Sequence, residues 1–254
     1  MNANAQTINK LLIEIQSSGG SDALLKSVLR AYELAMRLFT GSYSGSGKTT
    51  IAHLVGTASV LSELRAPRAV VTAGLLHSAY LTGDFGDGDA RVTKTKRERV
   101  RCATGDLAEE YVFRFANLRW WPKTIPAIFA SMETLESIDK DVLLIRLADD
   151  LDRHRDLGAL YLYRDSSEAR EFIDSCGDTM IAMARKLEYP QLADALDRVF
   201  EETLTAEVPA FLRDLKWVGT SPVIPPESHR KRVGVLARRC AIELLQHRLS
   251  FRRR

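Results

Sequence analysis

Apolar residues recur at the spacing of an amphipathic helix along almost the whole chain, and this periodicity constrains the fold most strongly. In residues 22–39, for example, apolar side chains return every three or four positions, as they do when one face of a helix packs against a core. No segment alternates apolar and polar residues convincingly over the length of a strand. The sequence therefore predicts an all-α fold. We expect helices over residues 6–17, 22–39, 50–64, 68–80, 94–116, 123–136, 139–155, 166–187, 190–205 and 229–247.

The composition is that of a globular protein with a buried core. Of 254 residues, 45% are hydrophobic and 27% are charged. The three cysteines are widely spaced and form no CxxC pair, so neither a disulfide framework nor a zinc ribbon is expected. No window approaches the roughly 20 apolar residues of a membrane-spanning helix, and the first residues do not resemble a signal peptide. We therefore expect a cytoplasmic protein that is neither exported nor inserted in a membrane.

Positive charge is concentrated at the C-terminal end of the chain. Residues 229–254 hold nine Lys or Arg against one acid, although the net charge of the whole chain is only +3. Three prolines in residues 219–227 predict a linker before this segment. We therefore expect an N-terminal helix in residues 1–20, a helical domain over 21–218, and a linker with a basic C-terminal helix over 219–254. The basic helix offers a route to nucleic acid, but a solvated helix face is the favoured interpretation.

The glycine-rich segment 41–48 (GSYSGSGK) superficially resembles a phosphate-binding loop. The nucleotide-binding pattern G-x-x-x-x-G-K-[ST] needs glycine at the position of Ser42, however, and Gly41 lies one residue too early. Such a loop also follows a buried strand, whereas residues 31–39 have helical periodicity. We therefore do not interpret this segment as a nucleotide-triphosphate site.

Three residues with metal-binding chemistry, His53, His77 and Asp149, fall in three separate predicted helices. Imidazole and carboxylate groups that rigid helices bring together suit a divalent metal. Taken singly, each residue is more simply explained as a packed or surface side chain. A metal site formed by these three residues is therefore a hypothesis that depends on the wider sequence pattern around them.

That pattern resembles the hydrolase domain of the RelA/SpoT alarmone enzymes, within the HD superfamily of metal-dependent phosphohydrolases. The resemblance covers roughly residues 22–205 and consists of five segments in the same order at similar spacing. These are Ala31–Ala35, the S-G and I-x-H elements of residues 46–53, Ala73–His77, Leu147–Asp149, and the helix pair within residues 180–204. The resemblance implies an HD-like helical bundle in which His53, His77 and Asp149 bind a divalent Mn, Fe or Zn ion.

The chain also departs from that family at several functional positions. Ser78 stands where the adjacent aspartate of the His-Asp pair is expected, and a neutral hydroxyl is a much poorer ligand than a carboxylate. The family's acidic pair falls on Leu81 and Thr82, its guanosine-contacting residues on Ser44 and Gly45, and its asparagine and threonine after the third ligand on Arg153 and Asp156. Alarmone hydrolysis is therefore not expected.

Three accounts of the site remain open. His53, His77 and Asp149 could still hold a metal, with Asp84, Asp87 or Asp89 as a general base or a further ligand. Alternatively, the site could perform metal-free acid/base chemistry through the same three residues and Tyr80, or it could be a non-catalytic ligand-binding pocket.

Our leading hypothesis is a remodelled HD-family enzyme that acts on a small anionic or phosphorylated molecule. In the leading version of this hypothesis, the protein is a metal-dependent hydrolase. In the alternatives, it is a metal-free biosynthetic enzyme or a non-catalytic ligand-binding or regulatory module. The candidate catalytic residues are Asp84, Tyr80 and Ser78, and Lys48 and Arg153 are the candidates for binding the anionic substrate. We expect Trp120 and Trp121 to pack at a helix corner, Asp150 and Asp152 to face solvent, and no membrane to be a partner.

Overall fold

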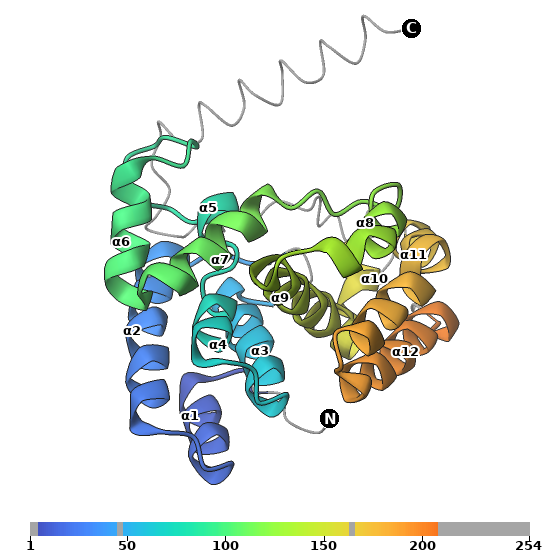
Figure 1. Cartoon of the computed structure of the whole chain (residues 1–254), viewed down its shortest axis with the longest axis horizontal. Coiled ribbons are helices and arrows are strands. Elements are labelled where there is room, and N and C mark those ends of the chain that lie inside the picture. The colour runs from blue at the N-terminus through green and yellow to red at the C-terminus, as the bar shows by residue number, and fades with distance from the viewer. Residues whose placement is uncertain (1–4, 45–47, 163–165, 208–254) are drawn as a thin grey trace, which may run out of the picture.

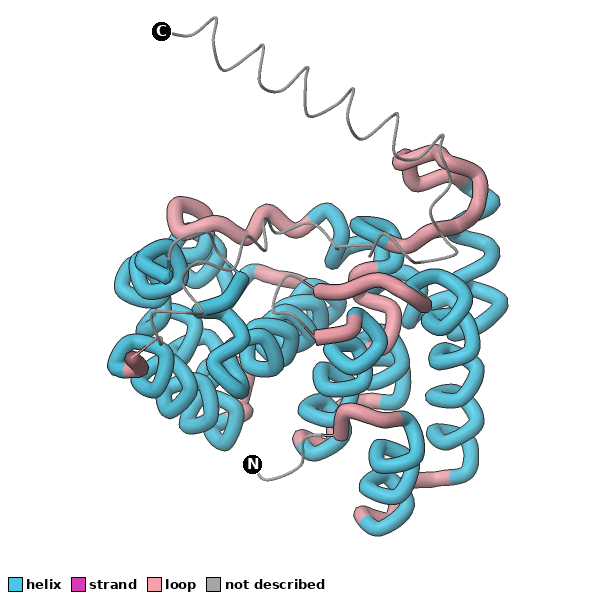
Figure 2. Tube along the Cα trace, turned by 180° about the vertical axis from the view of Figure 1, so that it is seen from behind, coloured by secondary structure: helices cyan, strands magenta, loops and turns pink. Residues whose placement is uncertain are grey.

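The computed structural model describes residues 5–44, 48–162 and 166–207. Helices joined by loops make up this part of the chain, as Figure 2 shows, and an isolated antiparallel bridge between Tyr43 and Thr49 is its only β-type pairing. The all-α prediction is confirmed. The helices are α1 (Ile8–Ser17), α2 (Asp22–Phe39), α3 (Thr50–Glu63), α4 (Arg68–Gly74), α5 (Ala79–Thr82), α6 (Lys94–Thr104), α7 (Asp106–Asn117), α8 (Ile125–Ser131), η1 (Met132–Thr134), α9 (Ser137–His154), η2 (Arg155–Leu157), α10 (Gly158–Leu162), α11 (Ser166–Lys186) and α12 (Pro190–Thr205).

Hydroxyl side chains fix the start of several helices. Ser21 accepts a hydrogen bond from the backbone N–H of Leu24 at the start of α2, and Thr49 accepts one from Ala52 at the start of α3. These caps satisfy backbone donors that have no partner within the helix. The segment that resembled a phosphate-binding loop therefore ends at a conventional helix cap.

Three predicted helices are shorter or divided in the structure. The helix expected over 68–80 is wrong in its second half, because α4 ends at Gly74 and a turn precedes α5. The helix expected over 94–116 breaks at Gly105, whose φ of 88° is left-handed and suits glycine. The helix expected over 123–136 is reduced to α8 and the 3₁₀ turn η1, and the short helix α10 was not predicted. The helix expected over 229–247 lies outside the described residues.

Helix α9 lies at the centre of the molecule, between two groups of helices (Figure 1). It contacts α3, α4 and α7 on one side and α10, α11 and α12 on the other. Eleven of its residues are buried, including four consecutive positions, Val142–Ile145, that point in different directions around the helix. In the second half of α9, polar side chains such as Asp149, Asp150 and Asp152 are therefore enclosed by other helices.

Helices α3 and α9 approach closely because Gly56 has no side chain. A Cβ atom at this position would overlap the carboxylate of Asp152 on α9. Glycine costs some helix propensity here, but it allows the two helices that carry His53 and Asp149 to pack tightly.

The N-terminal helix α1 places Leu11 and Ile15 in the main core, where α1 contacts α2 and α3. The division of the chain at residues 218 and 219 remains a prediction, because residues 208–254 lie outside the described part. Among the described helices, none combines the length and the apolar character that crossing a membrane would require.

A candidate metal centre on the central helix

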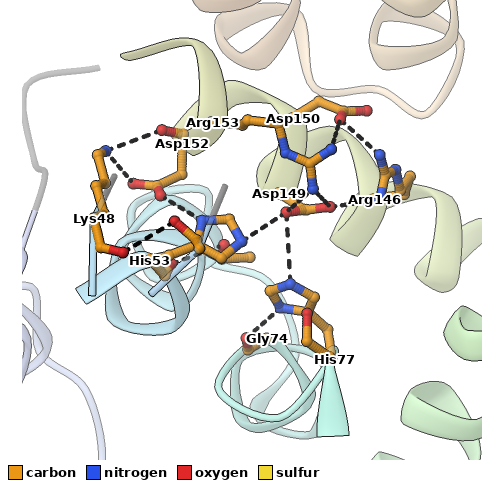
Figure 3. A network of polar contacts seen from close by, with 12 residues as sticks. Lys48, His53, Gly74, His77, Arg146, Asp149, Asp150, Asp152 and Arg153 are labelled. Atoms are coloured by element: carbon orange, nitrogen blue, oxygen red, sulfur yellow. Dashed lines mark hydrogen bonds and ion pairs between the residues drawn. The ribbon is translucent and has the colours of Figure 1, made fainter. Parts of the chain in front are cut away.

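The fold brings His53, His77 and Asp149 together from three elements. His53 lies on α3, His77 lies in the turn between α4 and α5, and Asp149 lies on α9. All three side chains are buried, and one ligand atom from each lies within 4.8 Å of the others. Figure 3 shows both imidazole rings pointing toward the Asp149 carboxylate. The described part of the chain therefore contains a set of three residues that could hold a metal ion.

His53 is held between two carboxylates. Its Nδ1 lies 2.8 Å from Asp152 Oδ2, and its Nε2 lies 2.9 Å from Asp149 Oδ1. Burial alone lowers the pKa of this imidazole, but the hydrogen bonds and charges of Asp149 and Asp152 outweigh burial and raise the pKa of His53 to about 9. The bond to Asp152 fixes the ring orientation and directs Nε2 toward the centre, as outer-sphere carboxylates do for metal-binding histidines.

His77 is oriented by the backbone. Its Nδ1 lies 2.8 Å from the carbonyl oxygen of Gly74, so Nδ1 carries the proton and donates it to this acceptor. Its ring packs against Phe115, with the ring centroids 4.8 Å apart. The remaining nitrogen, Nε2, is buried and makes no hydrogen bond to any described residue. A buried polar atom without a hydrogen bond is uncommon, and here Nε2 faces the carboxylate of Asp149.

The arrangement of these atoms fits a small divalent cation. His77 Nε2 and Asp149 Oδ1 are 3.5 Å apart. Two ligands bound to one tetrahedral ion at about 2.1 Å each would lie about 3.4 Å apart. The distance between His53 Nε2 and Asp149 Oδ1 is shorter, at 2.9 Å, and is closer to the about 3.0 Å between neighbouring ligands of an octahedral ion. Two imidazole nitrogens and one carboxylate oxygen also form a donor set that suits Zn, Fe or Mn. The residues present therefore fit the metal that the sequence predicted, although three protein ligands leave part of its coordination to other molecules.

The two oxygens of Asp149 share one arginine and differ in their other partners. Oδ1 faces the histidines, whereas Oδ2 accepts a hydrogen bond from Arg146 Nη1 at 2.6 Å. Arg153 Nη2 lies 3.2 Å from both oxygens. Burial opposes ionisation of Asp149, but the charges of Arg153, Arg146 and His77, together with the hydrogen bond to His53, hold the pKa of this carboxyl well below its usual range. Asp149 is therefore an ionised ligand whose Oδ1 remains directed at the two histidines.

The expectation that Asp150 and Asp152 face solvent is wrong, because both are buried. Asp150 accepts hydrogen bonds from Trp120 Nε1 and Arg146 Nη2, each at 2.8 Å. The physical reason is the central position of α9, which has no solvent-exposed face for these residues. Arg146, Asp150 and Asp152 were not named as site residues, yet the spacing of an arginine three and four residues before two aspartates in an apolar helix is a signal for internal ion pairs.

The predicted substrate-binding residues both lie at this network. Lys48 Nζ donates a hydrogen bond to the backbone oxygen of Asp152 at 3.0 Å and lies 3.5 Å from its Oδ1. Arg153 contacts Asp149, as described above. Two cationic side chains therefore border the candidate metal centre, and their role in binding a substrate stays a prediction.

The predicted catalytic residues have other contacts. The Tyr80 hydroxyl donates to Glu109 Oε1 at 2.7 Å, and burial together with this carboxylate raises the pKa of Tyr80. Asp84 Oδ1 accepts the backbone N–H of Gly86 at 2.8 Å. Ser78 is half-buried and immediately precedes α5. No hydrogen bond or ion pair between described residues joins Tyr80 or Asp84 to the three candidate ligands, and the catalytic roles stay predictions.

A cavity of about 420 Å³ lies beside the network. Trp120 and Trp121 both line it, but only Trp120 is buried, whereas Trp121 is 66% exposed. The expectation that both tryptophans pack at a helix corner therefore holds for Trp120 alone.

Comparisons with known proteins give partial matches. Residues 36–119 match a family described as a domain of unknown function, DUF6817, which covers about a third of the chain. Two curated proteins named GTP pyrophosphokinase are also similar: one from Streptomyces coelicolor, 27% identical over 150 residues, and one from Streptomyces antibioticus, 26% identical over 153 residues. Each match covers 59% of this chain and only 17% of the relative, so the chain spans less than a fifth of the length of these relatives. The chain is thus distantly similar to one segment of GTP pyrophosphokinases.

Proposed function

We propose that this chain is a metal-dependent hydrolase of HD type that acts on a small anionic or phosphorylated molecule. One observation carries the proposal: His77 Nε2 is buried without a hydrogen-bond partner and lies 3.5 Å from Asp149 Oδ1, where His53 Nε2 also points. Packing alone does not require two imidazole nitrogens to face one carboxylate oxygen, whereas coordination of a cation does require ligand atoms that face one point.

In this proposal, residues of the chain have distinct roles around the metal. His53, His77 and Asp149 hold the ion, while Asp152 and the Gly74 carbonyl keep the two imidazole rings in the required orientation. A bound Mn, Fe or Zn ion would lower the pKa of a water ligand and polarise the bond to be cleaved.

Other residues are proposed to handle the substrate and the proton. Lys48 and Arg153 attract the anionic group of the substrate, since both cations border the centre. Asp84 is the proposed proton acceptor, because it is a half-exposed carboxylate in the loop after α5. Ser78 replaces the expected fourth ligand and leaves the ion with three protein ligands.

The substrate is proposed to differ from an alarmone. The name GTP pyrophosphokinase belongs to the two relatives, and their match covers 17% of each. Leu81, Thr82, Ser44 and Gly45 have none of the charges that the resemblance requires at the water-handling and guanosine-contacting positions. The chemistry that best fits the remaining residues is hydrolysis of another small phosphoester.

A second candidate function is acid/base catalysis without a metal. It is favoured by the position of His53 between Asp149 and Asp152, which raises the pKa of His53 to about 9 and makes the ring a charged proton donor at neutral pH. In that case the two histidines act on the substrate directly. A metal-free biosynthetic reaction or a ligand-binding role would then replace hydrolysis.

Metal content distinguishes these functions. The experiment measures bound Mn, Fe and Zn in the purified protein and in the His53→Ala and His77→Ala variants, after incubation with each metal. The matched control is His154→Gln, which changes a buried histidine that is hydrogen-bonded to Thr203 and lies outside the candidate ligand set.

The hydrolase proposal predicts about one metal ion per chain in the wild type and in the control, and loss of the ion in both alanine variants. Phosphoesters are then screened with the metal that binds. Absence of metal in all four proteins would overturn the proposal and favour metal-free catalysis.

A further inference from the structure

The cavity beside the candidate metal centre has an aromatic wall and an apolar rim. Phe115, Trp120, Trp121 and Phe172 contribute aromatic rings to its lining. Leu81 and Trp121 also line it, although they are 54% and 66% exposed to solvent. Large apolar side chains that remain exposed at the edge of a cavity are typical of surfaces that a ligand covers.

The opposite part of the lining is polar and includes two arginines. Arg146 and Arg153 both line the cavity, together with Asp150 and His154. The Arg146 guanidinium lies 5.7 Å from the ring centroids of both Phe115 and Trp120, so aromatic rings hold it in place. Its two terminal nitrogens contact Asp149 and Asp150, but its Nε is buried and makes no hydrogen bond to any described residue. Arg146 therefore has a donor for which the described part of the chain supplies no acceptor.

The charges around these arginines do not oppose an anion. Three carboxylates of α9 are matched by three cationic side chains that contact them. The carboxylates are those of Asp149, Asp150 and Asp152, and the cations are Lys48, Arg146 and Arg153. Lys48 also lies 3.6 Å from Asp156, and the charged His53 lies between Asp149 and Asp152, so cations and carboxylates of the network remain equal in number. The negative charge of the carboxylates therefore does not exclude an anionic group from the arginines that line the cavity.

We propose that this cavity binds an organic anion with a flat aromatic ring, which packs against Trp121 and Leu81 while its charged group faces Arg146 and Arg153. The volume of about 420 Å³ lies within the range of small-molecule sites. Aromatic walls favour a planar ring because stacked or edge-to-face contacts add to the gain from burying apolar surface. As a description of the substrate, the inference rests on the proposed function. As a binding site, it stands on the lining of the cavity.

The test uses a probe that the protein cannot hydrolyse. Binding of 2-naphthalenesulfonate, which has a flat ring and an anionic group, is measured by calorimetry with the full-length protein. Methanesulfonate supplies the anion without the ring, and 2-naphthol supplies the ring without the anion. We expect only 2-naphthalenesulfonate to bind measurably, because each of the other two compounds lacks one of the two contacts.

The variant is Trp121→Ala, which removes an exposed ring and therefore leaves the core intact. We expect it to weaken binding of 2-naphthalenesulfonate by about threefold to tenfold, the size of one aromatic contact. The matched control is Ile13→Ala on α1, an apolar residue of similar exposure (57%) that does not line the cavity. This control should bind the probe as the wild type does.

Two results would overturn the inference. One is equal affinity of the wild type and Trp121→Ala for the probe, and the other is no binding of the probe to the wild type. Titrations with and without a metal chelator separate this inference from the proposed function. Binding of the probe to the chelator-treated protein supports the cavity, and the metal content of the purified protein tests the hydrolase separately. A protein that contains metal but does not bind the probe contradicts this inference and leaves the proposed function standing.

Discussion

Replacing Asp152 with asparagine tests whether this carboxylate orients a metal ligand. Asp152 Oδ2 lies 2.8 Å from His53 Nδ1, and its Oδ1 lies 3.4 Å from Gln6 Nε2 and 3.5 Å from Lys48 Nζ. Both oxygens therefore accept hydrogen atoms or face positive charge. An asparagine has only one acceptor oxygen, so either orientation of its amide places an N–H₂ group against another donor.

The expected loss of metal affinity follows from the hydrogen bond between Asp152 and His53, which Asp152→Asn weakens. A hydrogen bond to a charged group contributes about 1.5–3 kcal/mol. Loss of an outer-sphere partner of a metal-binding histidine weakens metal binding by roughly tenfold to a hundredfold, which is about the same free energy. We therefore expect the metal dissociation constant of Asp152→Asn to rise by that factor.

The pH of the measurement decides whether this loss is visible. The pKa of His53 is raised to about 9, so below this pH a proton competes with the metal for Nε2. Removing the Asp152 charge lowers the pKa of His53 and relieves this competition, which favours the variant. The loss of orientation is therefore seen in full at about pH 9.5, and the difference between variant and wild type should shrink toward neutral pH.

The assay is competition with a chromophoric chelator at several pH values, with Asp150→Asn as the matched control. Asp150 is buried on the same helix and accepts hydrogen bonds from Trp120 and Arg146, but it contacts neither histidine. Equal metal affinity of Asp152→Asn and the wild type at about pH 9.5 would refute the reasoning. So would an equal loss in Asp150→Asn, because a general weakening of the network would then explain the effect.

Further predictions concern the fourth ligand, acid stability and helix packing. Ser78→Asp should tighten metal binding on the order of tenfold in the same chelator assay, because it restores a carboxylate next to His77; unchanged affinity would show that this position does not face the ion. Burial lowers the pKa of His154 in the folded protein to about 3, whereas the pKa of a histidine in the unfolded chain is about 6.5. As the pH falls below 6.5, His154 is protonated in the unfolded chain but not in the folded protein, so the free energy of unfolding falls by up to about 1.4 kcal/mol per pH unit. His154→Gln should flatten this decline in urea unfolding between about pH 6 and pH 4, and an equally steep decline would contradict the assignment. Gly56→Ala should displace the Asp152 carboxylate and weaken metal binding, whereas Gly177→Ala, which meets Ile173 and Phe200 in another part of the fold, should leave metal affinity unchanged.

Local sequence signals were enough to predict the fold class and most helix starts. Apolar periodicity is a property of neighbouring residues, and the caps Ser21 and Thr49 act within three residues of their own helix. The ends of helices were harder to predict. The break after Gly74 depends on a turn in which the His77 side chain bonds to the Gly74 carbonyl, and apolar residues continue through it without a gap in the pattern.

The three candidate metal ligands could be named from the sequence, because their residue types and order resemble a known pattern. The geometry of these ligands could not be predicted from the sequence. The bond between His53 and Asp152 joins residues 99 positions apart, and it depends on the close approach of α3 and α9 at Gly56. Nothing local to Asp152 distinguishes it from a solvent-exposed aspartate.

The sequence by itself determined the all-α class, most helix starts and which side chains carry metal-binding chemistry. Only the tertiary structure decided which polar residues are buried, since the helices packed against α9 from both groups bury Asp150 and Asp152. It also decided that Trp120 is enclosed while the adjacent Trp121 stays exposed at a cavity. The physical reason is that helix formation depends on contacts within a few residues, whereas the environment of a side chain depends on partners that are distant along the chain.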